Sequence, residues 1–240
     1  MPTPTFTQIT SHIFKLDLPM AGGRIMVGVW LVRTDDGWTV VDAGAPSFED
    51  VTFQQILAQT GGEIPQRLIL THGHLDHAAA AQRMRDAWKL PIAAGRAEIP
   101  YLLGPARYNT IPGHLSYRLL QLSPPPLLGR NVQLPLDEGM ALDGLEVFEA
   151  LGHAPGMVAL LHRADRALIC GDAFANGRGK LGDPLSIFTY DIALNRRSQA
   201  RLAALDFDHL LVSHGPPILS EGRARAQALV ASREKKKKAG

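Results

Sequence analysis

The chain lacks the features that mark several broad classes of protein. It contains one cysteine, Cys170, in 240 residues, so no disulfide can form within it. A reducing cytoplasm is therefore the plain expectation for its compartment. No apolar stretch approaches the ~18 residues that a membrane-spanning helix needs. The N-terminus has no basic segment followed by an apolar one, which a signal peptide would require. We expect a cytoplasmic protein without a membrane partner.

The chain also lacks a strong excess of charge of either sign. Lys and Arg number 25 against 23 Asp and Glu, which gives a net charge of +2. Such a balance does not favour nucleic acid as a partner, so we expect a small-molecule substrate instead. The one basic run, Lys235–Lys238, lies at the C-terminal end, and we interpret it as a solvated tail or helix end. The oligomeric state is left open.

Alternating strands and helices make up most of what is present. The length and the hydrophobic content of 45% fit one well-buried core, so we expect residues 1–240 to form a single domain. Apolar β-branched runs predict strands, and helical spacing of apolar residues predicts helices between them. The expected strands are 25–32, 38–41, 68–70, 92–94, 145–151, 157–162, 167–170 and 210–212, and the expected helices 48–59, 78–88, 96–103, 192–205 and 221–232. This order predicts an α/β fold with helices covering sheet faces.

One short motif carries the chemistry. His72-Gly-His74-Leu-Asp76-His77 directly follows the expected strand 68–70. Residues two apart in an extended chain point the same way, so His72 and His74 can reach one ion together. Asp76 and His77 fall where the strand turns into a helix and can face a second ion. Three imidazoles and a carboxylate are a ligand set that zinc and its neighbours prefer.

Three later residues extend this set. His153, Asp172 and His214 each follow an expected strand and are each flanked by glycine. Any one of them alone would more often be a structural histidine or a turn aspartate. Strand ends that converge on one edge of a sheet would bring all three to the first motif, which favours a shared site.

With these residues, the sequence resembles the metallo-β-lactamase superfamily from about residue 25 to residue 217. The resemblance implies an αββα sandwich of two mixed sheets flanked by helices, with metals at one edge. It implies that His72, His74 and His153 hold a first metal, that Asp76, His77 and His214 hold a second, and that Asp172 bridges both. Asp42, in Val40-Val-Asp-Ala-Gly44, matches the family's acidic residue that orients the site.

Departures from other members of the superfamily narrow the expected activity. The β-lactamases of this fold typically lack the bridging aspartate, and many use a cysteine ligand. Here Asp172 occupies that place, and we interpret Cys170 as a buried core thiol. Only about two dozen residues follow His214-Gly-Pro-Pro217, so we do not expect the helical C-terminal domain of the glyoxalase II enzymes, and Ala154 stands where they commonly have threonine. The remaining pattern is similar to small lactonases, thioesterases and esterase-like hydrolases.

The expected function is hydrolysis of an ester, lactone or thioester of a small molecule. Two divalent ions, preferably zinc with manganese or iron as alternatives, would share a hydroxide that attacks the carbonyl carbon. Asp76 would accept a proton during turnover. Phosphodiester hydrolysis, iron-dependent sulfur oxygenation and a non-catalytic metal-binding module are the alternatives.

The surroundings of the metals should set the choice of substrate. Residues 104–130 hold five prolines and no regular pattern, which predicts a wall or lid over the metals. The aromatic and basic residues around the motifs are the candidates for substrate contact, namely Tyr101, Tyr108, His114, Tyr117, Arg118, Phe174, Phe188 and Tyr190.

Overall fold

The structure is a computed structural model that describes residues 3–106, 127 and 132–239, with side chains through Lys235. Tyr108, His114, Tyr117 and Arg118 lie outside the described residues. The predicted role of segment 104–130 as a wall or lid therefore stays a prediction.

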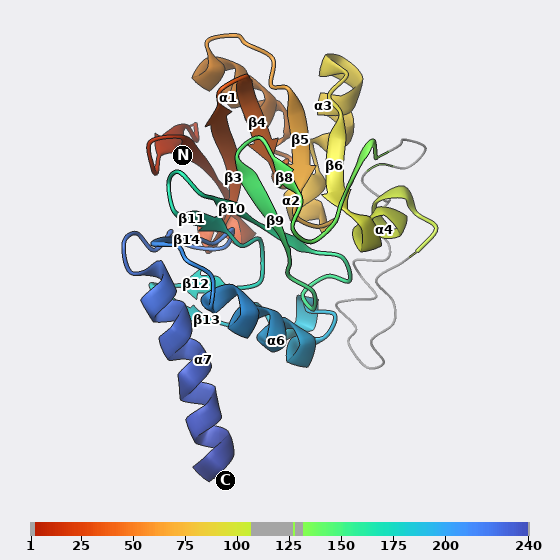
Figure 1. The fold of residues 1–240 in the computed structure, drawn as a ribbon. Helices are drawn as coiled ribbons and strands as arrows, with labels where there is room; N and C mark the ends of the chain where they lie inside the picture. Colours follow the sequence, from red (N-terminus) through yellow and green to blue (C-terminus); the bar gives the residue numbers. More distant parts are fainter. Residues whose placement is uncertain (1–2, 107–126, 128–131, 240) are drawn as a thin grey trace.

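The first sheet follows the chain from one edge to the other (Figure 1). Its first four strands are antiparallel, and β4 to β7 are parallel. Parallel pairing places the carboxyl ends of β4 and β5 at one edge of the sheet. The strands are β1 (Phe6–Gln8), β2 (Ile13–Met20), β3 (Ile25–Thr34), β4 (Gly37–Val41), β5 (Arg67–Leu70), β6 (Ile92–Gly95) and β7 (Leu134–Leu136).

The second sheet has the order β14-β11-β10-β9-β8, in which β11 and β14 are parallel and the remaining pairs antiparallel. Its strands are β8 (Ala141–Leu142), β9 (Leu145–Glu149), β10 (Val158–His162), β11 (Ala167–Ile169) and β14 (His209–Leu211). Between β11 and β14 in the chain lies a separate hairpin of β12 (Ala175–Gly177) and β13 (Lys180–Gly182).

Alternation along the strands defines four layers. In β5, Ile69 lies in the core between the two sheets, whereas Leu68 and Leu70 face the helices on the outer side. In β10, Leu160 faces the core between the sheets and Leu161 faces the opposite outer layer. Because successive side chains in a strand point to opposite faces, each sheet is buried on both sides. The predicted αββα sandwich is confirmed.

The first outer layer consists of α1 (Glu49–Thr60), α2 (Leu75–Ala78), α3 (Ala81–Trp88) and α4 (Ile99–Leu103), which begins after the turn η2 (Arg96–Glu98). The helix expected over 78–88 is in fact divided into α2 and α3. The N–H groups of Ala79 and Ala80 donate to the carbonyls of Gly44 and Ala43 instead of to their own helix. These two hydrogen bonds connect the end of the His72–His77 motif to the loop after β4.

The second outer layer consists of α6 (Ile192–Ala203) and α7 (Gly222–Ala239). Leu202 of α6 and Ala226 of α7 are buried against the outer face of the second sheet. The expected last helix was too short, because α7 continues through the backbone of the basic run and ends at the C-terminus in Figure 1. Short turns η1 (Ala21–Gly23) and η3 (Ser186–Phe188) complete the structure. Within the described residues, no helix is both long and apolar enough to cross a membrane.

Candidate metal centre

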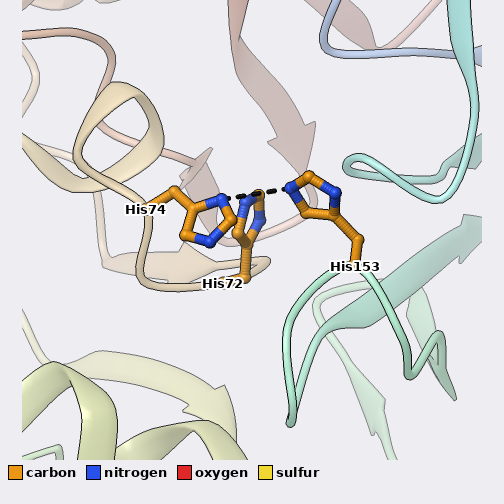
Figure 2. Close-up of side chains that lie close together, drawn as sticks. All are labelled: His72, His74 and His153. Atoms are coloured by element: carbon orange, nitrogen blue, oxygen red, sulfur yellow. Dashed lines mark hydrogen bonds between the residues drawn. The ribbon is translucent and has the colours of Figure 1, made fainter. Parts of the chain in front are cut away.

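Three histidines from two loops form a first cluster, which we call the imidazole cluster: His72, His74 and His153. His72 and His74 follow β5, and His153 lies in the turn between β9 and β10. Figure 2 shows the three rings facing one another across the gap between these loops. The ring centroids of His72 and His74 lie 4.6 Å apart, and those of His74 and His153 lie 4.8 Å apart. All three side chains are buried.

A second group, the mixed cluster, consists of Asp76, His77 and His214. Asp76 and His77 lie in α2, and His214 follows β14. The Nε2 atom of His214 lies 3.2 Å from Oδ2 of Asp76, and the His77 and His214 rings are 5.5 Å apart. Parallel pairing of β14 with β11 brings His214 beside Asp172.

Asp172 lies between the two clusters and contacts both. Its Oδ2 is 3.3 Å from Nε2 of His153 and 3.2 Å from Nε2 of His214, and its Oδ1 is 3.4 Å from Nε2 of His77. The structure thus brings together all seven side chains that the sequence singled out. One carboxylate that contacts ligands of both clusters is the arrangement expected of a group shared by two ions.

The donor atoms of these side chains fit divalent metal ions. His153 Nε2 and His74 Nδ1 lie 3.1 Å apart, close to the ~3.3 Å expected for two ligands of one tetrahedral ion. The His72 and His77 Nε2 atoms and Asp172 Oδ1 are buried and have no hydrogen-bond partner in the part of the chain that the structure describes. Buried polar atoms are almost always satisfied, so such a group requires an explanation. An ion among them provides one.

Asp42 orients the mixed cluster from behind. Its Oδ2 lies 2.8 Å from Nδ1 of His77, and its Oδ1 accepts the backbone N–H of Thr71 at 2.8 Å. The side chain is fully buried. A carboxylate at Nδ1 holds the proton on that nitrogen. The Nε2 atom of His77 is then left without a proton, and its lone pair can bind an ion beside Asp172.

Other histidines of the site have neutral partners. His153 Nδ1 lies 3.2 Å from the Thr189 hydroxyl, which itself donates to the Leu185 carbonyl at 2.9 Å. His214 Nδ1 lies 3.0 Å from the Met26 carbonyl. Each contact fixes one ring nitrogen, so that the other faces the site. Sequence reasoning missed Thr189 and Met26, because neither has a motif that reveals a contact across loops.

Glu98 is a second buried carboxylate that the sequence did not reveal. Its Oε1 accepts the N–H of Gly73 at 2.9 Å, and its Oε2 accepts the N–H of Gly156 at 2.7 Å. Gly73 lies between His72 and His74, and Gly156 lies in the loop of His153. One fully buried side chain therefore connects the two loops that form the imidazole cluster.

Burial lowers the pKa of some histidines of the site, and neighbouring carboxylates raise the pKa of others. Desolvation, followed by repulsion from His153, lowers the pKa of His74 to about 3. Desolvation also lowers the pKa of His153 to about 4. At His214 burial acts in the same direction, but Asp172 and Asp76 outweigh it and raise its pKa to about 10. The pKa of His77 is likewise raised, because Asp172, Asp76 and Asp42 outweigh its burial.

The two carboxylates of the site stay ionised. Burial would raise the pKa of Asp76, but His77 and His214 together lower it below its ordinary value. The pKa of Asp172 is lowered well below its ordinary value for the same reason, through His214, His77 and His153 against its burial. Both side chains are therefore anionic at neutral pH and available as ligands.

A pocket of about 750 Å³ opens onto both clusters, and His74, His153, Asp76, His214 and Asp172 contribute to its lining. Phe188, one of the predicted substrate contacts, also lines it. Phe174 does not, because it is fully buried in the outer core of the second sheet, so that prediction was wrong. Tyr101 and Tyr190 are not among its lining residues.

Cys170 is buried in the core beside the second sheet, as interpreted from the sequence. Burial raises the pKa of its thiol. The group has neither the exposure nor the ionisation that a reactive cysteine needs.

A further group of His12, His162 and Asp165 lies on other elements. Asp165 Oδ1 lies 2.7 Å from His12 Nδ1, while its Oδ2 accepts the backbone N–H of His12 at 2.9 Å and the Thr10 hydroxyl. His162 Nδ1 accepts the N–H of Asp165 at 3.2 Å. These atoms are already occupied in joining the segment between β1 and β2 to the turn after β10.

Comparison with known proteins agrees with this geometry. The model of the Metallo-beta-lactamase superfamily matches residues 22–215. The chain is 29% identical over 223 residues to the probable metallo-hydrolase YybB of Bacillus subtilis, covering 88% of this chain and 91% of that protein. It is 29% identical over 203 residues to the probable metallo-hydrolase YflN of the same organism, covering 75% and 76%.

Solved structures share the fold. TTHA1623, described in a di-iron-bound form, has a TM-score of 0.64 at 28% identity, over 87% of this chain and 98% of that one. A beta-lactamase domain protein from Burkholderia ambifaria has a TM-score of 0.69 at 24% identity, over 96% of this chain and 73% of that one, and shows the likeness of fold alone.

Proposed function

The chain belongs to the metallo-β-lactamase superfamily, and from that premise we propose that it is a dinuclear metallo-hydrolase that cleaves an ester, lactone or thioester of a small molecule. The observation that carries the proposal is the position of Asp172 between two clusters of ligands beside one pocket. Such a shared carboxylate is expected where two ions act on one substrate group.

The ligand roles follow from the clusters. His72, His74 and His153 would hold one ion, Asp76, His77 and His214 the other, and Asp172 both. Imidazole and carboxylate donors suit zinc, and they also suit manganese and iron. We propose zinc, with iron as the alternative that the di-iron-bound form of TTHA1623 favours.

The chemistry divides between the ions and the chain. Two bound ions would lower the pKa of a water molecule toward neutrality and polarise the substrate carbonyl. Asp76 lies in the pocket lining and is ionised at neutral pH, so its carboxylate can accept a proton during turnover. Asp42, Thr189 and the Met26 carbonyl keep the histidine rings in a fixed orientation. Cys170 is not available as a nucleophile, because it is buried away from the pocket.

The test begins with metal content and chelation. Protein loaded with excess zinc should contain close to two ions per chain by elemental analysis. Removal of metal with a chelator should abolish hydrolysis, and its return should restore it. One ion or none per chain would refute the dinuclear proposal, and activity without metal would point to a protein nucleophile.

The reaction class is tested with substrates. Metal-loaded protein should hydrolyse chromogenic esters, lactones or thioesters faster than β-lactams and phosphodiesters. Preferential turnover of a phosphodiester would replace ester hydrolysis as the reaction class. Iron as the ion bound in the native host, together with oxygen consumption on a thiol substrate, would favour sulfur oxygenation.

A further inference from the structure

Three cationic side chains line the pocket. Arg24, Arg178 and Lys180 line it, and all three are exposed. Arg178 and Lys180 belong to the β12–β13 hairpin, and Arg24 lies between η1 and β3. Among the described residues, no acidic side chain forms an ion pair with any of the three. Asp183, which also lines the pocket, already pairs with Arg196 and Arg233 at 2.7 Å each.

Several arginines elsewhere in the molecule do form ion pairs with carboxylates. Arg166 lies between Asp206 and Asp208, Arg96 pairs with Asp137, and Arg67 pairs with Asp143. These surface arginines are paired, whereas the three cations of the pocket lining form no ion pair within the described part of the chain. Fixed charges of one sign along a concave site attract ligands of the opposite sign.

The backbone conformation at Arg178 also supports a functional role for this residue. Arg178 has a φ of 53° and Gly179 a φ of 76°, between paired Gly177 and Lys180. Two left-handed residues between antiparallel strands form a tight hairpin turn, in which asparagine, aspartate or glycine is strongly preferred. An arginine at this position costs conformational energy, and such outliers concentrate at functional sites. Arg166 shares the left-handed backbone, but its guanidinium has protein partners.

The hairpin is held in place against the rest of the molecule. Arg225 of α7 donates to the Gly179 carbonyl at 2.8 Å, and the hairpin lies beside α7 in Figure 1. Asn176 of β12 donates from its backbone N–H to the His214 carbonyl at 3.0 Å. The cationic turn is therefore tied to the same loop that carries a ligand of the mixed cluster.

Apolar side chains complete the pocket wall. Ile25 is 37% exposed and Leu185 58% exposed, and both line the pocket together with Met20 and Phe188. Exposed apolar side chains beside a concave site are typical of a surface that a ligand covers. The pocket lining thus combines apolar side chains with cationic ones.

We propose that the substrate carries an anionic group on an apolar chain, and that Arg178 and Lys180, together with Arg24, bind this group while the scissile carbonyl lies at the metal clusters. The inference rests on the proposed hydrolase function, because it concerns the substrate of the same site. It assigns specificity to three residues that hold no metal.

The first experiment compares two esters of equal chain length on metal-loaded protein: para-nitrophenyl hydrogen adipate, which ends in a carboxylate, and para-nitrophenyl hexanoate, which does not. We expect a higher kcat/KM for the anionic ester. In the double variant Arg178→Asn, Lys180→Gln, the ratio of the two kcat/KM values should fall about tenfold, the size of one lost hydrogen bond between charged groups. Asparagine suits the tight turn, so the variant should not unfold.

Arg197→Gln is the matched control. Arg197 is an exposed arginine of α6, outside the pocket, with no ion pair among the described residues. Combined with Lys235→Gln, an exposed lysine of α7 outside the pocket, Arg197→Gln removes two positive charges, as the double variant does. A ratio that falls equally in this control would mean that only overall charge matters and would overturn the proposal. An unchanged ratio in the double variant would overturn it as well.

A binding experiment separates failure of this inference from failure of the proposed function. Anilinonaphthalene sulfonate and N-phenylnaphthylamine differ only in the anionic group, and both report binding by fluorescence. The double variant should raise the Kd of the sulfonate about tenfold relative to that of the neutral amine, whether or not any ester is hydrolysed. Equal effects on both probes would overturn the inference and leave the hydrolase proposal standing.

Discussion

The imidazole cluster and the mixed cluster lie side by side and share Asp172, but they differ in charge. The imidazole cluster has rings whose pKa values are lowered, to about 3 at His74 and about 4 at His153. The mixed cluster has ionised Asp76 and a His214 whose pKa is raised to about 10. Two adjacent sites built from similar residues should therefore bind the same ion with different dependence on protons, because metal binding requires neutral imidazole.

The largest effect is expected when the residue common to both clusters is removed. Asp172→Ala deletes the carboxylate that contacts His77, His153 and His214, and leaves excess positive charge when ions bind. We expect kcat/KM for a chromogenic ester to fall by about 10³-fold, comparable to removal of a key electrostatic group in other enzymes. Cys170→Ala, two residues away, should cost only packing. Equal loss of activity in both folded variants would place Cys170 in the site.

The next effect is that of pH on the two clusters. At pH 6 to 8, His214 of metal-stripped protein carries a proton that an ion must displace, because its pKa is about 10. The pKa of His77 is raised as well, so affinity of the mixed cluster should fall by at least about tenfold per pH unit as pH decreases, or at least about a hundredfold between pH 8 and 6. The imidazole cluster should change little in this range, because His74 and His153 are neutral above pH 5.

Cobalt titrations of stripped protein at several pH values, with proton release measured alongside, would check this difference. Two binding steps should separate as pH falls, and the weaker one should release protons. A single step whose affinity is independent of pH would contradict the division into two kinds of cluster.

A smaller effect is expected from the residues behind the ligands. Asp42→Asn keeps a side chain that tolerates the left-handed backbone at φ 63°, but removes the charge facing His77. We expect metal affinity of the mixed cluster to fall about ten- to a hundredfold. Thr189→Val removes one neutral contact to His153, and its effect on the imidazole cluster should be smaller. Chelator competition would measure the loss of metal affinity in each variant. A larger loss in Thr189→Val than in Asp42→Asn would contradict the importance given to the charge of Asp42.

The smallest effect is expected at Glu98. Glu98→Gln keeps the shape but turns an amide N–H₂ toward one of the N–H groups of Gly73 and Gly156. The free energy of unfolding should fall by about 1–3 kcal/mol, the cost of an unsatisfied buried polar group. Metal affinity of the imidazole cluster should weaken, and that of the mixed cluster should not. Glu146→Gln, which removes the same charge from an ion pair with Arg163, is the control. Equal loss of metal affinity at both clusters in Glu98→Gln would mean that the substitution destabilises the whole site and not the imidazole cluster alone.

The ligands that the sequence predicted were found from patterns among residues close together in the chain. His72, His74, Asp76 and His77 could be found because they lie within six residues, and His153, Asp172 and His214 because each follows an apolar strand. Apolar β-branched runs predicted the strands, and the resemblance to the metallo-β-lactamase superfamily predicted the layers. The division between α2 and α3 could not be predicted, because it depends on carbonyls of Ala43 and Gly44 from a distant turn.

The residues that surround the ligands were missed for the same reason. Glu98 and Thr189 act through contacts between loops far apart in the chain, and nothing in their local sequence indicates a partner. Arg178 and Lys180 look like ordinary surface residues in the sequence, because only the hairpin places them in the pocket that the clusters also line. Phe174 was misplaced because an aromatic residue after a ligand can face either the pocket or the core, and here it faces the core.

The glycines around the site predict where this family can diverge in sequence. A Cβ at Gly152 would lie 2.1 Å from the backbone of Asn195, and one at Gly156 would lie 2.0 Å from the backbone of Glu98. The loop that carries His153 is thus closed to substitution at these two positions. A Cβ at Gly177 would meet nothing within 4 Å, and Arg178 and Lys180 in the same hairpin are exposed, whereas Gly179 has a φ of 76° that favours glycine. The hairpin can therefore change several of its side chains without disturbing the loop of His153, so the pocket lining can vary independently of the ligands.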